Sequence, residues 1–102
     1  MHKEPEPFRT KTVGANDNHG IFLLNAPGAV VENNRIDTIT SGTGNRYALR
    51  FSSSKNVLAV GNRITNAEVG IFFTGANGKY RDNLTVNVEK PYLGGTDAGN
   101  NN

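Results

Sequence analysis

Two segments of this chain end in the same way, with an apolar run followed by Asn-Arg-Ile. The sequence AVVENNRI covers residues 29–36, and VLAVGNRI covers residues 57–64. A repeated unit constrains the fold strongly, because each copy has to bury its apolar residues in the same manner as the others. The chain is therefore expected to consist of stacked copies of one structural unit.

The repeat becomes clearer when the asparagine is used to align the copies. Each copy then has an apolar residue three positions before the asparagine and another residue two positions after it. The aligned copies are Val31, Asn34 and Ile36; Ala59, Asn62 and Ile64; Tyr80, Asn83 and Thr85; and, more loosely, Phe8, Lys11 and Val13. Four copies in register predict a repeat over most of the chain.

A second pattern follows each copy of the first. It consists of two apolar residues separated by one position: Ile21 and Leu23, Leu49 and Phe51, Ile71 and Phe73, with Leu93 as a possible fourth member. This spacing places both side chains on one face of an extended strand. One repeat takes roughly 21 to 23 residues, and the insertion DTITSGTGNR at 37–46 lengthens one of them.

Short strands separated by turns bury their apolar residues by stacking one rung on the next. The 12 glycines and fifteen asparagines of the chain suit the turns, because both residues tolerate left-handed backbone conformations. In such a stack Asn34, Asn62 and Asn83 form a structural ladder at one corner, where each side-chain amide bonds to the next. The apolar pairs form internal files.

The strands GIFL and GIFF, together with VVENNRI and LAVGNRI, resemble the right-handed parallel β-helix (pectate-lyase-like) superfamily. The resemblance covers residues 8 to 93 and concerns the repeat, not a single enzyme. It implies an all-β fold, a right-handed parallel β-helix (solenoid) of about three to four rungs, as a short C-terminal portion of a longer solenoid or as a chain that oligomerises. The alternative fold is a small antiparallel β-sandwich or barrel.

The predicted organisation has three parts. Residues 1–7 form an extended arm, residues 8–93 form the β-helix, and residues 94–102 form a flexible tail, because GGTDAGNNN offers no apolar anchor. A chain of 102 residues holds one domain. No apolar stretch is long enough to cross a membrane, so no membrane partner is expected.

The candidate ligand-binding residues lie between the inward positions of the strands. Phe22, Arg50 and Phe72 point outward at equivalent positions and are expected to lie beside one another, with Arg46 and the insertion forming a wall next to them. Such a file can stack sugar rings and bind a carboxylate. It can equally form an oligomer interface, where Phe and Arg are enriched.

The charge of the chain also bears on its partners. A net charge of +2 and a pI near 9.2 favour an acidic partner such as an anionic polysaccharide. The basic residues are scattered and form no nucleic-acid motif, so no nucleic-acid partner is expected. Arg35, Arg63 and nearby Arg81 are predicted on neighbouring rungs, either as part of a solvated charge ladder or as an anionic-glycan patch.

Catalysis by this chain alone is not expected, and no catalytic residue is assigned. The resemblance implies lyases that use a base and a bound cation, but the outward file contains no carboxylate. The carboxylates Asp17, Asp37 and Glu68 are expected in turns without a shared register. No metal site or other cofactor is predicted, because His19 is a single turn histidine.

The leading hypothesis is a non-catalytic β-helix module, the terminal rungs of an exported carbohydrate-associated protein, that acts as a glycan-binding or assembly surface. The open rungs at the ends of such a stack predict a homo-oligomer or association with the rest of a longer solenoid. The alternatives are part of a polysaccharide lyase, epimerase or glycosidase, and a structural trimeric fibre or tail protein. The expected location is extracellular or at the cell surface.

Overall fold

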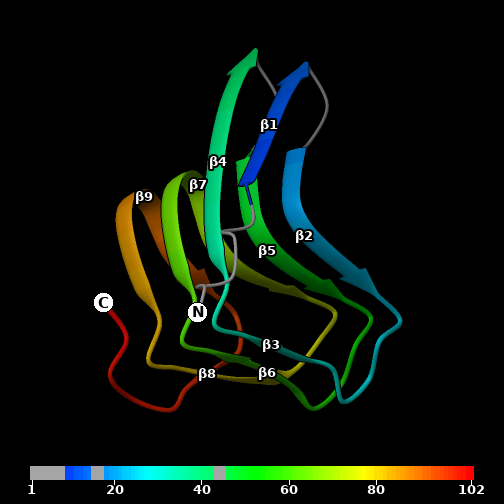
Figure 1. Cartoon of the computed structure of the whole chain (residues 1–102). Helices are drawn as coiled ribbons and strands as arrows, with labels where there is room; N and C mark the ends of the chain where they lie inside the picture. Colours follow the sequence, from blue (N-terminus) through cyan, green and yellow to red (C-terminus); the bar gives the residue numbers. More distant parts are fainter. Residues whose placement is uncertain (1–8, 15–17, 43–45) are drawn as a thin grey trace, which may run out of the picture.

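The structure is a computed structural model that describes residues 9–14, 18–42 and 46–102. The chain winds into a coil whose strands are stacked side by side (Figure 1). The strands are β1 (Arg9–Gly14), β2 (Asn18–Leu24), β3 (Val30–Glu32), β4 (Arg35–Gly42), β5 (Arg46–Ser52), β6 (Val57–Val60), β7 (Arg63–Thr74), β8 (Gly78–Arg81), β9 (Leu84–Leu93) and β10 (Thr96–Asp97). Within the described residues there is no helix.

The strands form two sheets in which every pairing between described strands is parallel. One sheet has the order β1-β4-β7-β5-β2 with β9 also paired to β7, and the other has the order β10-β8-β6-β3. The prediction of an all-β parallel β-helix is confirmed, and the antiparallel alternative is wrong. The count of three to four rungs stays a prediction, because part of the first rung lies outside the described residues.

The long strands bend, so each coil has three faces. The strands β3, β6, β8 and β10 form the first face, along the bottom of Figure 1. The second face contains the start of β4 with the first halves of β7 and β9, and the third contains β2 and β5 with the second halves of β7 and β9. Asn66 and Asn87, with φ of 59° and 57°, mark the bend between these two faces.

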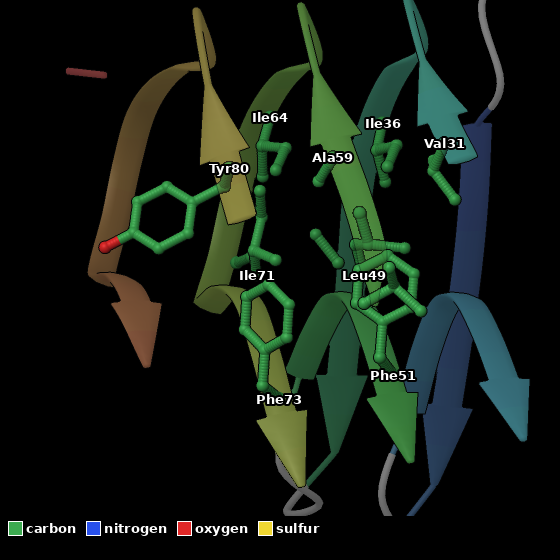
Figure 2. Close-up of a cluster of buried hydrophobic side chains, with 12 residues drawn as sticks. Val31, Ile36, Leu49, Phe51, Ala59, Ile64, Ile71, Phe73 and Tyr80 are labelled. Carbon is green, nitrogen blue, oxygen red and sulfur yellow. The ribbon is translucent and has the colours of Figure 1, made fainter. Parts of the chain in front are cut away.

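The predicted inward files lie in register inside the coil. Ile21 pairs with Leu49 and Leu49 with Ile71, while Leu23 pairs with Phe51 and Phe51 with Phe73. Figure 2 shows the central members of these files packed against residues of the other two faces. The members drawn are Leu49, Phe51, Ile71 and Phe73, and the residues of the other faces are Val31, Ala59, Tyr80, Ile36 and Ile64. Five large apolar side chains of the core are almost completely buried: Ile36, Leu49, Phe51, Ile64 and Ile71. Full burial of each contributes about 1.5–3 kcal/mol to stability, which makes these files the main stabilising element.

The corner between the first and second faces carries an asparagine ladder. Asn34 Nδ2 and the Asn34 backbone N–H both donate to Asn62 Oδ1, at 3.2 and 3.1 Å. Asn62 donates in the same way to Asn83 Oδ1, at 3.1 and 2.9 Å, and Asn83 to Asn101 Oδ1, at 3.1 Å in both bonds. The three predicted residues thus lie in one hydrogen-bonded file, and Asn101 is a further member that the sequence analysis missed.

Each ladder asparagine follows a residue in the left-handed backbone conformation. These residues are Asn33, Gly61, Asp82 and Asn100, with φ of 57°, 67°, 56° and 57°. Asn, Asp and Gly are the residues that adopt this conformation at least cost. The Asn-rich and Gly-rich composition therefore follows from the need to turn the backbone at the same corner in each coil.

The glycine that precedes each GIF strand is required by the close approach of neighbouring backbones. A Cβ on Gly20 would lie 2.6 Å from the Ala48 carbonyl oxygen, and one on Gly70 would lie 2.4 Å from the Pro91 carbonyl oxygen. Both distances are shorter than a real Cβ contact allows. The Gly-Ile-Phe motif at 20–22 and 70–72 thus reflects the tight packing of one coil on the next at the glycine.

Two alignments from the sequence are wrong. The upstream copy built on Lys11 fails because β1 pairs with the inserted part of β4, so that Lys11 lies opposite Ile39 and Val13 opposite Ser41. The fourth inward residue is Tyr92, which pairs with Ile71, and not Leu93, which pairs with Phe72. Leu93 is 40% exposed and therefore extends the outward file.

The segment predicted as a flexible tail has hydrogen-bonded partners. Thr96 and Asp97 pair with Lys79 and Tyr80 in the first face. The Asn102 backbone N–H donates to the Asn83 carbonyl, and the Asn102 carbonyl accepts a bond from the Thr85 N–H, both at 3.0 Å. These residues therefore continue the coil beyond the boundary that the sequence placed at residue 93.

Candidate ligand-binding surface

The outward side chains of the third face form a file along the coil. Phe22 pairs with Arg50 and Arg50 with Phe72, so the three predicted residues are neighbours on consecutive coils. Tyr47, which the sequence analysis did not select, joins them. We refer to Phe22, Tyr47, Arg50 and Phe72 as the aromatic–arginine surface.

Arg50 is the centre of this surface. Its guanidinium carbon lies 5.2 Å from the ring centroid of Phe22, 5.3 Å from that of Phe72 and 5.6 Å from that of Tyr47. All three distances are within the range of a cation–π interaction. Arg50 Nε also donates to Thr74 Oγ1 at 3.3 Å. Contacts with the three rings and the hydrogen bond to Thr74 therefore help to hold the guanidinium in place.

The rings of the surface also contact each other and remain partly accessible to solvent. The Tyr47 and Phe72 rings are tilted by 43° with their centroids 5.2 Å apart, a favourable arrangement for an aromatic pair. Phe22 is 45% exposed, while Tyr47, Arg50 and Phe72 are half-buried. The surface thus presents fixed aromatic edges and faces on the outside of the coil.

Arg46 lies at the start of β5 and is exposed. Its backbone N–H is 3.4 Å from a carboxylate oxygen of Glu68. Among the described residues, no hydrogen bond or ring contact joins the Arg46 side chain to the aromatic–arginine surface. Its participation in ligand binding stays a prediction, and the tip of the predicted wall, residues 43–45, lies outside the described residues.

The sequence could not identify Tyr47 because its position depends on a local bend. Ala48 and Leu49 are consecutive in the strand, yet both are fully buried. Simple alternation of inward and outward residues therefore fails between Tyr47 and Arg50. The signal that could have found Tyr47 is its proximity in sequence to Arg50.

Several other predicted residues have different surroundings from those expected. Arg35 and Arg63 are neighbours in register, but the next residue of their file is Leu84 and not Arg81. Arg81 instead forms an exposed ion pair with Asp82 at 2.5 Å. Asp37 and Glu68 lie in strands β4 and β7 instead of turns, and His19 lies in β2. Asp17 lies outside the described residues.

At the C-terminal end of the coil, two tyrosine rings close the core. Tyr80 and Tyr92 are stacked with centroids 4.5 Å apart. The Tyr92 hydroxyl oxygen lies 3.2 and 3.0 Å from the carbonyl oxygens of Asn83 and Asn102, so its single proton can form one bifurcated hydrogen bond to both. Burial, followed by the proximity of Tyr80 and Asp97, raises the pKa of Tyr92 to about 12. Burial also raises the pKa of Tyr80.

In the part of the chain that the structure describes, no group of three or more His, Cys, Asp or Glu side chains could hold a metal ion. The same part has no helix with the length and apolar character needed to cross a membrane.

The stacked parallel coils, the asparagine corner and the outward file define a parallel β-helix protein. The chain belongs to the NosD family, which is described as periplasmic copper-binding protein and whose family model matches residues 6–100. This family is a β-helix family, so the predicted resemblance is confirmed at the level of the fold. Neither a curated protein nor a solved structure gives a significant match to the chain.

The family description raises the question of whether this chain can hold copper. Copper sites in proteins use Cys and Met sulfur or His imidazole ligands. The chain contains no cysteine, one methionine and two histidines, and the side chains of Met1, His2 and His19 lie outside the described part. The described residues therefore do not fit a copper site. The description of the family as periplasmic is consistent, at a coarse level, with the expected extracellular or cell-surface location.

Proposed function

We propose that this chain is a non-catalytic binding module of an exported β-helix protein, and that the aromatic–arginine surface binds carbohydrate. The observation that carries the proposal is the position of Arg50, whose guanidinium is surrounded by the rings of Phe22, Tyr47 and Phe72 at 5.2 to 5.6 Å. These contacts fix the rings before a ligand arrives, which reduces the entropic cost of binding.

The chemistry of the surface suits the C–H face of a sugar. A sugar ring has an apolar face that packs on an aromatic ring and hydroxyl groups at its edge that accept bonds from a guanidinium. Neighbouring strands are about 4.8 Å apart, a spacing close to the length of one sugar unit. Phe22 and Phe72 lie two strands apart, with Arg50 on the strand between them. A glycan that runs along the coil can therefore place alternate units on the two rings and the unit between them on Arg50.

The proposed role is binding and not catalysis, because the four residues that define this surface supply aromatic rings and a guanidinium, and neither a carboxylate nor an imidazole. Copper binding is not part of the proposal, since the described residues lack its ligands. An acidic glycan is the preferred class, because the chain has a net charge of +2.

The proposal can be tested with a glycan array followed by calorimetry on the best ligand. Phe72→Ala is expected to weaken binding about tenfold or more, which corresponds to about 1.4 kcal/mol. Val30→Ala is the matched control, because Val30 is an apolar residue that is 54% exposed on the first face, away from the proposed surface. It should leave the affinity unchanged.

Light scattering at several protein concentrations distinguishes carbohydrate binding from assembly. A chain that binds no glycan but forms an oligomer that Phe72→Ala dissociates would overturn the carbohydrate proposal and identify the surface as an interface between copies. A chain that binds no glycan and stays monomeric would overturn it as well.

A further inference from the structure

A second surface lies on the second face of the coil. Two outward files run across it: Arg35, Arg63 and Leu84 in one, and Asp37, Thr65 and Val86 in the other. They line a groove of about 280 Å³ together with Ile36 and Ile64. We refer to this groove as the arginine groove; it is separate from the aromatic–arginine surface.

The charges of the arginine groove are not balanced. Arg35 and Arg63 are both exposed and lie side by side in register. Within the described part of the chain, neither of them forms an ion pair. Like charges directly opposite each other on neighbouring strands are destabilising. An anion that binds between the two guanidinium groups would remove this repulsion.

The carboxylate in the groove is already engaged with other groups. Asp37 Oδ1 accepts a hydrogen bond from Thr65 Oγ1 at 3.0 Å and another from Asn66 Nδ2 at 2.9 Å. These bonds hold the Asp37 carboxylate toward the bend at Asn66. Among the described side chains that line the groove, Arg35 and Arg63 are therefore the ones that can bind an incoming anion.

The other end of the groove is apolar. Leu84 is 41% exposed and Val86 is 60% exposed, although both are large hydrophobic residues. A ligand that matches both ends has an oxyanion beside an apolar group. The volume of the groove lies near the lower limit for small-molecule sites, which indicates a small ligand or one end of a longer one.

We propose that the arginine groove binds a small organic anion, whose carboxylate or phosphate bridges Arg35 and Arg63 while its apolar part packs on Leu84 and Val86. Paired guanidinium groups bind either oxyanion through parallel N–H···O bonds. The proposal does not depend on carbohydrate binding at the aromatic–arginine surface, because the two surfaces lie on different faces.

The test uses three probes with the same apolar group: hexanoate, hexyl phosphate and hexanol. Binding is followed by NMR through the backbone amide signals of residues 35–37, 63–65 and 84–86. At least one of the two anions is expected to shift these signals, with an affinity that falls as salt is added, and hexanol is expected to leave them unchanged. The stronger anion identifies the preferred oxyanion.

Arg63→Gln is expected to weaken binding of that anion at least tenfold. Arg81→Gln is the matched control, because it removes the same charge from a residue that pairs with Asp82 outside the groove. Val86→Ser should weaken binding of the hexyl probe more than binding of inorganic phosphate. The proposal is overturned if neither anion shifts the groove signals, or if Arg81→Gln weakens binding as much as Arg63→Gln.

Discussion

The asparagine corner and the aromatic–arginine surface are both files of side chains repeated along the coil, but their burial is the reverse of what their polarity suggests. Asn62 and Asn83 are buried, with exposures of 0% and 1%, whereas Phe22 is 45% exposed. The buried amides are tolerated because, in the described residues, no buried side-chain polar atom lacks a hydrogen-bond partner. The comparison teaches that polarity alone does not decide burial: the corner amides are buried because they bond to one another, and the Phe22 ring is exposed because it lies on the outer side of the coil.

The largest effect is expected from the substitution Asn62→Ala. Asn62 Nδ2 donates to the Val31 carbonyl at 3.0 Å, and its Oδ1 accepts both bonds from Asn34. The substitution leaves several buried groups without partners, each at a cost of about 1–3 kcal/mol. We expect the free energy of unfolding to fall by about 4 kcal/mol, as measured by urea unfolding.

The matched control for this prediction is Asn34→Ala at the start of the same ladder. Asn34 is only half-buried, so water can replace part of what is lost, and the expected cost is about 1 kcal/mol. Equal losses in the two variants would contradict the idea that burial makes the ladder important.

A smaller effect is expected from Asn101→Ala, which removes the ladder member that the sequence analysis missed. Asn101 Oδ1 accepts two bonds from Asn83, and Asn101 Nδ2 donates to the Tyr80 carbonyl at 3.0 Å. The expected loss is about 2 kcal/mol, because Asn83 retains its bond to the Ala59 carbonyl. Hydrogen exchange should show faster exchange of the Asn102 amide; unchanged exchange would show that the segment is held by other contacts.

A pH dependence is expected from the tyrosine stack next to the corner. The pKa of Tyr92 is about 12 in the folded chain, against about 10 for an unfolded tyrosine. Stability is therefore fully present below pH 10 and is lost as the pH rises towards 12, because the unfolded chain releases the proton first. The effect is about 1 kcal/mol after allowance for solvent screening of this partly exposed ring.

Urea unfolding on either side of pH 10 measures this effect. Tyr92→Phe should reduce the alkaline loss and leave the part that arises from Tyr80. An alkaline loss of the same size in the variant would show that Tyr92 does not cause it.

The smallest effect on stability is expected at the aromatic–arginine surface. Arg50→Gln removes the cation–π contacts but leaves the core files intact, so the free energy of unfolding should fall by less than about 1 kcal/mol. The same variant should reduce glycan affinity in the calorimetric assay. A loss of several kcal/mol would mean that this surface, like the corner, is part of the fold.

The sequence was sufficient to predict the parallel coil because its side-chain files depend on two regular spacings. Within a strand, inward residues are two positions apart, and between neighbouring coils, equivalent residues are roughly one repeat apart. Ile21, Leu49 and Ile71 illustrate this success. The prediction failed where the spacing changes. The ladder steps are 28, 21 and 18 residues from Asn34 to Asn101, so a fixed period missed Asn101.

The candidate site was only partly predictable for a related reason. Strand alternation identified Phe22, Arg50 and Phe72. It does not predict that Tyr47 lies beside Arg50, because the two consecutive residues between them, Ala48 and Leu49, are both buried. The apolar end of the arginine groove was missed as well. The sequence pattern predicts Arg81 as the neighbour of Arg35 and Arg63, but Arg81 pairs in the other sheet and Leu84 takes this place.

The asparagine ladder also has an evolutionary consequence. The segment from Arg63 to Asn83 begins just after one ladder residue and ends at the next, and Asn83 bonds to the ladder residues on both sides, Asn62 and Asn101, through the same pair of bonds. A tandem duplication of this segment in the gene would add a winding whose corner residue already fits the ones above and below it. Proteins with this fold can thus gain coils by duplication of such a segment, because its apolar residues already fit the existing core.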